Sequence, residues 1–143
     1  MTDKTYQLDI VTPEKKVFSE KVDFAVFPGS EGELGILLNH APLLSRLDPG
    51  EIRITRDKKN DCMAISGGFL EVRKNEVSVI SETAEYANQI DLTRAIAEKE
   101  SAEAELKNAS APAEKKSADL RLKKALARVK VAEKSANTPQ EKH

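Results

Sequence analysis

The sequence predicts an α+β fold, in which an N-terminal antiparallel β-sandwich of eight to ten short strands precedes a C-terminal antiparallel two-helix hairpin. All six glycines and all six aromatic residues lie before residue 87, and the remainder is rich in Ala, Lys and Glu. Residues 1–88 hold 11 basic and 15 acidic residues, a net charge of −4, whereas residues 89–143 hold 12 and 9, a net charge of +3. We therefore expect a sandwich domain over 1–87, a helical domain over 88–137, and a disordered tail over 138–143.

Alternation of apolar and polar residues predicts the strands of the first domain. Tyr6, Leu8 and Ile10 alternate with polar residues, and the same period recurs over 22–26, 52–54 and 77–79. Turn-forming residues separate these segments at intervals of roughly ten residues, which is typical of a sandwich or flattened barrel.

Helical periodicity begins at Asp91, a suitable N-cap, and predicts a first helix over 91–107. A second helix is predicted over 113–135, since its apolar residues recur every three or four positions. That stripe consists of Ala118, Leu122, Ala125, Leu126, Val129 and Ala132. Small side chains bury little area, so we expect the hairpin to be held less firmly than the sandwich and to be able to detach.

Composition excludes several classes of function. The chain has 143 residues and a net charge of −1, which disfavours a large enzyme and a general polyanion-binding role. It has no apolar run of bilayer length and no signal-peptide pattern, so a cytosolic product is expected. Cys62 is the one cysteine in the sequence and, with two histidines, cannot complete a zinc site.

Motifs for catalysis are weak. Ser66 precedes two glycines but lacks the pattern of a nucleophile elbow, and His40 has no evident acid or base partner. The glycine-rich segment 28–35 has neither dinucleotide-binding spacing nor a P-loop lysine, and its glutamates would repel phosphate. It is either a wide turn or an exposed acidic loop offered to a partner.

The second helix carries a stripe of positive charges. These charges either face solvent without a specific role or form a contact surface. This half of the chain has no aromatic residue to stack on bases and few large apolar residues to enter a membrane, so an acidic protein surface is the favoured partner. The cations assigned to this contact are Arg121, Lys123, Lys124, Arg128 and Lys130.

Several motifs, in order, resemble the epsilon subunit of bacterial F-type ATP synthase. The resemblance runs from about residue 4 to 135, and its motifs are Val26 to Leu37, His40 to Leu44, Gly50 to Ile54, Ser66 to Val72, Ala84-Glu85 and Ile90 to Ala95. It implies a ten-stranded sandwich bound to the gamma subunit and the membrane rotor ring, and a hairpin that inhibits ATP hydrolysis at the catalytic alpha and beta subunits. The implied protein is a non-catalytic central-stalk subunit of the rotor that couples proton or sodium translocation to ATP synthesis. It is peripheral on the cytoplasmic side of the inner membrane. Its implied ring contacts are Ser30, Glu31, Gly32, Glu33 and His40.

The resemblance also bears on a regulatory ATP site, the one candidate ligand site. Some family members bind ATP at a motif that starts the first helix, with arginines from both helices. The corresponding residues here are Glu85, Ile90, Asp91, Arg94, Ala95, Lys124 and Arg128. Ser101 and Lys124 stand where arginines are expected, and neither supplies bidentate phosphate geometry, so we expect weak ATP binding or none. An ATP-sensing module acting through the same hairpin is the alternative function, and a capped helix with an ion pair to the sandwich is the alternative role of Asp91 and Arg94.

Overall fold

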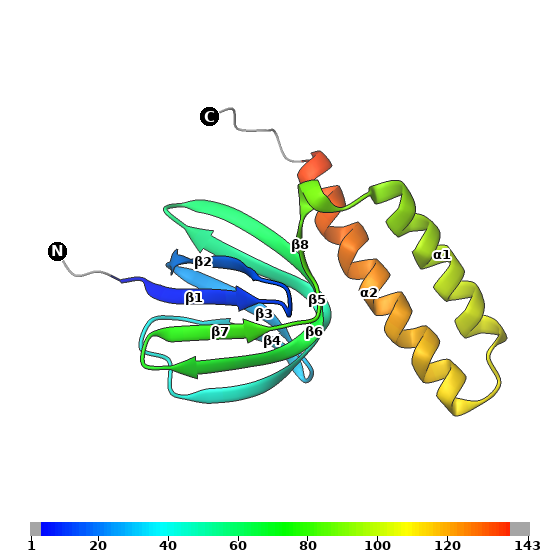
Figure 1. Ribbon diagram of the computed structural model, residues 1–143, viewed down its shortest axis with the longest axis horizontal. Coiled ribbons are helices and arrows are strands. Elements are labelled where there is room, and N and C mark those ends of the chain that lie inside the picture. Colours follow the sequence, from blue (N-terminus) through cyan, green and yellow to red (C-terminus); the bar gives the residue numbers. More distant parts are fainter. Residues whose placement is uncertain (1–3, 138–143) are drawn as a thin grey trace.

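The computed structural model describes residues 4–137 as a β-sandwich with a helical hairpin against one side (Figure 1). The predicted tail over 138–143 lies outside the described residues. The elements, in order, are β1 (Tyr6–Val11), β2 (Lys16–Val22), β3 (Phe24–Gly29), β4 (Gly32–Ile36), β5 (Leu43–Arg56), β6 (Lys59–Arg73), β7 (Glu76–Ile80), β8 (Ala84–Tyr86), a 3-10 turn (Ala87–Gln89), α1 (Leu92–Asn108) and α2 (Pro112–Asn137).

The strands form one sheet in the order β2-β1-β7-β6-β5-β3-β4, with β8 paired to β6. The eight strands found over residues 4–137 lie within the expected range, and the predicted sandwich is confirmed. One feature differs from the predicted antiparallel arrangement: β1 and β7 are parallel, with Leu8 opposite Val77, so the sheet is mixed. Local alternation predicts that a segment is a strand but not the direction of its neighbour, which is set by long-range pairing.

The two long strands, β5 and β6, let one sheet form both layers. They have 14 and 15 residues, and their pairing skips one opposed pair, Asp48 and Gly67, without a change of register. Gly68 is required next to this gap in the pairing, because its φ is +141° and an added Cβ would clash with the Ile80 carbonyl oxygen.

The sandwich core has the alternation expected from the sequence. Tyr6, Leu8 and Ile10 are buried along β1, and they pack with Phe27 and Leu70 from other strands. The Tyr6 hydroxyl donates to the Ile36 carbonyl oxygen at 2.8 Å, and burial raises the pKa of this phenol well above its usual value. Each fully buried side chain of this kind contributes about 1.5–3 kcal/mol.

The helices lie within about two residues of their predicted ends. Asp91 is the N-cap of α1, as predicted, and its Oδ1 accepts a hydrogen bond from the Arg94 backbone N–H at 3.1 Å. Pro112 begins α2 instead of remaining in the linker, since the first helical position needs no N–H donor. The linker is therefore shorter than predicted and covers 109–111.

Helix α2 lies between the sandwich and α1, which Figure 1 shows as the outer helix. Of its predicted stripe, Leu126 is 43% exposed, contrary to expectation. Ala127 and Val131 are buried although they lie outside the stripe, because they pack with the apolar cluster of the helix–sheet interface. A single apolar stripe could not predict a helix that is covered on two sides. Over the described residues, neither helix is long and apolar enough to cross a membrane.

Candidate functional site at the interface of hairpin and sandwich

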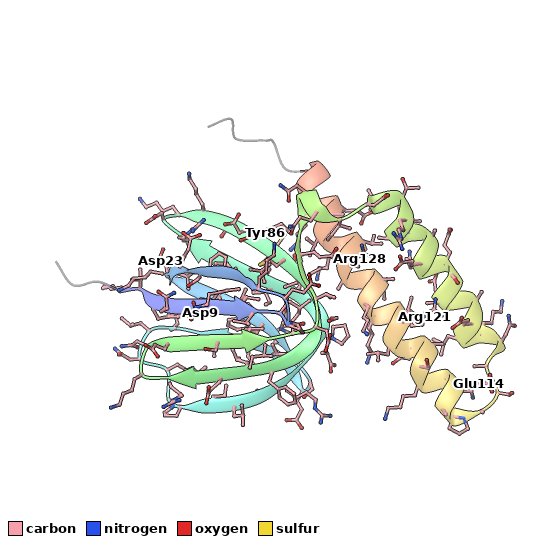
Figure 2. All side chains as sticks on the ribbon, in the orientation of Figure 1. Asp9, Asp23, Tyr86, Glu114, Arg121 and Arg128 are labelled. Atoms are coloured by element: carbon pink, nitrogen blue, oxygen red, sulfur yellow. The ribbon has the colours of Figure 1, made fainter. Side chains whose placement is uncertain are left out.

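Arg128 of α2 joins three elements at the base of the hairpin, which is the end opposite the 109–111 linker. Its Nε donates to Glu85 Oε1 of β8 at 3.0 Å, and its guanidinium also contacts Glu98 Oε2 of α1 at 3.2 Å. The Arg128 side chain is 23% exposed, and Figure 2 shows it on the part of α2 that faces the sandwich. Partial burial strengthens these contacts relative to surface ion pairs, so Arg128 ties α2 to both neighbours.

The start of α1 continues this network. Arg94 Nε lies 3.2 Å from Glu98 Oε1, so Glu98 bridges Arg94 and Arg128. Asp91 caps the same helix, whereas Ile90 and Ala95 are buried in the apolar cluster beneath it. Arg94 therefore pairs within its own helix and not with the sandwich, and Arg128 makes the ion pair to the sandwich.

The predicted nucleotide residues are thus only partly gathered. Glu85, Asp91, Arg94 and Arg128 surround the base of the hairpin, while Lys124 is exposed one turn along α2 from Arg128. Both guanidinium groups already contact Glu98, so a polyphosphate would compete with that carboxylate for them. In this arrangement the internal carboxylates compete directly with an anionic ligand.

Most of the cations assigned to an inhibitory contact have acidic partners in the folded hairpin. Arg121 pairs with Glu105 of α1, and Lys123 Nζ lies 3.4 Å from Asp119 Oδ2 one turn away on α2. Lys130 Nζ lies 3.7 Å from Oε1 of Glu51, a buried residue of β5. Four of these five cations therefore have acidic partners within the chain, although the side chains of Arg121, Lys123 and Lys130 are 45%, 49% and 59% exposed.

The glycine-rich segment is a tight hairpin and not the wide turn that was one of its two interpretations. Gly29 pairs with Gly32, which leaves Ser30 and Glu31 as an exposed two-residue turn between β3 and β4. Glu33 is committed to Arg53 of β5 through contacts of 2.7 and 3.2 Å, and these hydrogen bonds hold the pKa of the Glu33 carboxyl below its usual range.

His40 is separated from the turn at Ser30 and Glu31 by the length of β4. It follows the opposite end of β4, in a loop fixed by the hydrogen bond from Asn39 N–H to Asn75 Oδ1 at 2.9 Å. Its Nδ1 lies 2.7 Å from the Ala41 carbonyl oxygen. The residues assigned to the ring contact therefore fall into two groups at opposite ends of β4.

Glu98 and Glu51 are the functional candidates that the sequence did not reveal. Glu98 stands four residues after Arg94, a spacing that could have predicted the helical ion pair. Glu51 gave no such signal, because its burial comes from α2 covering the outer face of β5.

Comparison with known proteins shows the family of the chain. The family model described as ATP synthase, Delta/Epsilon chain, beta-sandwich domain matches residues 5–87, and that described as ATP synthase, Delta/Epsilon chain, long alpha-helix domain matches residues 88–133. The two matches together span the sandwich and the hairpin, and the chain belongs to the ATP synthase delta/epsilon chain family.

Individual relatives of the chain are named as ATP synthase epsilon chains. The ATP synthase epsilon chain of Pelotomaculum thermopropionicum is 54% identical over 132 residues, covering 92% of this chain and 98% of the relative. That of Desulforamulus reducens is 48% identical over 130 residues, covering 91% and 98%. A chain in the structure of the Euglena gracilis mitochondrial ATP synthase (OSCP, F1 and c-ring) has a TM-score of 0.77 at 22% identity, covering 95% of this chain and 83% of that chain, which supports the fold.

Proposed function

We propose that the hairpin is a conditional brake on ATP hydrolysis and that the sandwich anchors it to the rotor of an F-type ATP synthase. The chain is an epsilon-type central-stalk subunit and not the catalytic subunit. Its partners are the gamma subunit, the membrane rotor ring and the catalytic alpha and beta subunits. It has no active site of its own, and it is peripheral on the cytoplasmic side of the inner membrane through the complex.

The observation that carries the proposal is the pairing of the α2 cations. Arg121, Arg128 and Lys130 each have an acidic partner on a different neighbouring element in the folded state. A helix whose cations already bind acids can exchange them for acids on another protein at little net electrostatic cost. The folded and extended hairpins are then two states that partners can bias by their differential affinity.

The sandwich offers an apolar surface for the gamma subunit. Phe69 and Ile80 are 52% and 60% exposed and stand opposite each other on β6 and β7. Leu44 of β5 is 73% exposed and lies diagonally beside Phe69, since Arg46 is opposite Phe69 in the sheet. A contiguous exposed apolar patch of this kind is typical of a protein interface. The acidic turn at Glu31 is the candidate contact with the polar loops of the ring.

Weak ATP sensing through the same hairpin is the second candidate function. It is favoured by the approach of Arg94 and Arg128 to one carboxylate, Glu98, because a phosphate could take the place of that carboxylate. The same occupation limits affinity, so we expect ATP to bind weakly.

Truncation after Asn88 tests the main function. ATP hydrolysis by the reconstituted catalytic complex is compared for the full chain and the truncated chain, after both are shown to bind gamma. Hydrolysis should rise severalfold on truncation, with gamma binding retained. Unchanged hydrolysis would remove the brake from the account and leave the sandwich as an assembly element.

A further inference from the structure

Glu51 is a buried carboxylate at the centre of the contact between sandwich and hairpin. Its side chain is 2% exposed, and α2 covers the part of β5 that carries it. Lys134 Nζ lies 2.6 Å from its Oε2, and Lys130 Nζ lies 3.7 Å from its Oε1. Within the described part of the chain, neither Glu51 oxygen accepts a hydrogen bond of good geometry, so the charge is compensated mainly by these ionic contacts.

Glu51 lies against an apolar cluster, and Arg53 and the Cys62 thiol are also close to it. Its cross-strand partner on β6 is Ala64, which is buried in the same cluster as Ala127 and Val131 of α2. An ionised carboxylate in such a place is strongly unfavourable unless cations accompany it. The stability of the docked helix is therefore coupled to the charges that reach Glu51.

Two of those charges belong to α2 and not to the sandwich. Arg53 of β5 also lies near, at 3.7 Å from Glu51 Oε1, but it is held bidentately by Glu33. The side chains of Lys130 and Lys134 are 59% and 43% exposed, so an external acidic surface can reach them while the helix is still docked.

We infer that Glu51 makes docking of the hairpin conditional on Lys130 and Lys134, so that an acidic protein surface which takes these lysines also releases the helix. Removing one side of a buried ion pair is far more costly than removing both, because the remaining charge loses its compensation. Without the two lysines, the one ionic contact left to Glu51 among the described residues would be that with Arg53, at 3.7 Å. Loss of the Lys130 and Lys134 contacts would therefore release α2 from Glu51, and we call this set of three residues the latch. This inference rests on the proposed detachment of the hairpin and specifies what triggers it.

The test uses four full-length chains and amide hydrogen exchange over the second half of α2. They are the unmodified chain, Lys130→Gln with Lys134→Gln, the same pair with Glu51→Gln, and a control with Lys115→Gln and Lys116→Gln. The control removes the same charge from exposed positions at the start of α2. Exchange over the β6 amides reports whether the sandwich remains folded in each variant.

The lysine pair variant should exchange about tenfold faster over α2, because Glu51 is left buried with too little positive charge. Adding Glu51→Gln should return exchange close to that of the unmodified chain, and the control should not change it. Unaltered exchange in the lysine pair variant would overturn the inference. Fast exchange that Glu51→Gln does not restore would also overturn it, since the lysine stems and not their charges would then hold the helix.

Failure of the latch and failure of the brake are distinguishable. If truncation raises hydrolysis but the lysine variant leaves exchange unchanged, the brake stands and the latch is wrong. If the latch responds as expected in exchange but truncation leaves hydrolysis unchanged, the hairpin opens as inferred and does not inhibit.

Discussion

The sandwich and the hairpin are stabilised by different means. The sandwich buries large side chains such as Phe27, Leu70 and Ile52 at 0% exposure. The hairpin seam buries Ala118, Ala125 and other small residues. Its attachment to the sandwich combines a small apolar cluster with ion pairs from Arg128 and two lysines. Apolar burial is insensitive to a partner's charge, whereas ion pairs can be exchanged, so only the second domain is built to change its contacts.

The largest effect should come from the sandwich core. Phe27→Ala should lower the free energy of unfolding by about 3–5 kcal/mol, because it removes a fully buried aromatic ring and leaves a cavity. Urea unfolding monitored by circular dichroism measures this. Leu126→Ala, at a 43% exposed position of α2, is the control and should cost less than about 1 kcal/mol. Equal losses at the two sites would contradict the contrast between the domains.

The exposed face of the sandwich should matter for binding but not for folding. Phe69→Ser with Ile80→Ser should weaken binding to gamma by about 2 kcal/mol or more, since each side chain loses apolar area that an interface would bury. Titration of the isolated gamma subunit checks this, with the unfolding midpoint measured in parallel. Unchanged affinity would move the gamma contact to another face of the sandwich.

The attachment of the hairpin should be sensitive to single charges. Arg128→Ala should favour the detached hairpin by about 1–2 kcal/mol, because it removes the half-buried contacts with Glu85 and Glu98. Cys62 is a native reporter, since it packs against the helix–sheet cluster and burial raises the pKa of its thiol. Its labelling by a maleimide should accelerate in the variant, while Arg94→Ala, which removes an exposed contact within α1, should have a smaller effect.

The smallest effect should be the response of the sandwich to acid. Hydrogen bonds from Ser19 and Gln7 lower the pKa of Asp9 below its ordinary value of 3.8. The stability this gives is present above pH 3.8 and is lost as the pH falls through the lowered pKa. Asp9→Asn should therefore lower the free energy of unfolding by less than about 1 kcal/mol at neutral pH. It should also reduce the loss of stability that occurs as the pH falls below 3.8. If the free energy of unfolding falls equally with acid pH in the two proteins, Asp9 contributes nothing to stability.

Local patterns in the sequence predicted where the strands and helices lie. Strand pairing and the burial of single residues depended on long-range contacts that these patterns do not contain. Strand alternation identified the core of β1, and Asp91 was correctly predicted as the N-cap of α1. The parallel pairing of β1 with β7 and the burial of Val131 depend on segments far apart in the sequence, so no local period contains them.

The composition of the candidate site stays a prediction, and the arrangement of its residues comes from the structure. The family resemblance implied that Arg94 and Arg128 belong to one site, and the structure brings both to Glu98. It did not indicate Glu51, because a glutamate beside the buried Ile52 of a strand has the pattern of a solvent-facing residue. Only the packing of α2 on the second face of β5 buries that carboxylate.

Amide hydrogen exchange of the full chain, compared between α2 and β6, tests most directly whether the hairpin can leave the sandwich. The account predicts that α2 amides over 125–134 exchange through a local opening at rates well above those of buried β6 amides such as Leu70. Protection of α2 equal to that of β6 would mean that both domains open only by global unfolding, and it would contradict a detachable hairpin.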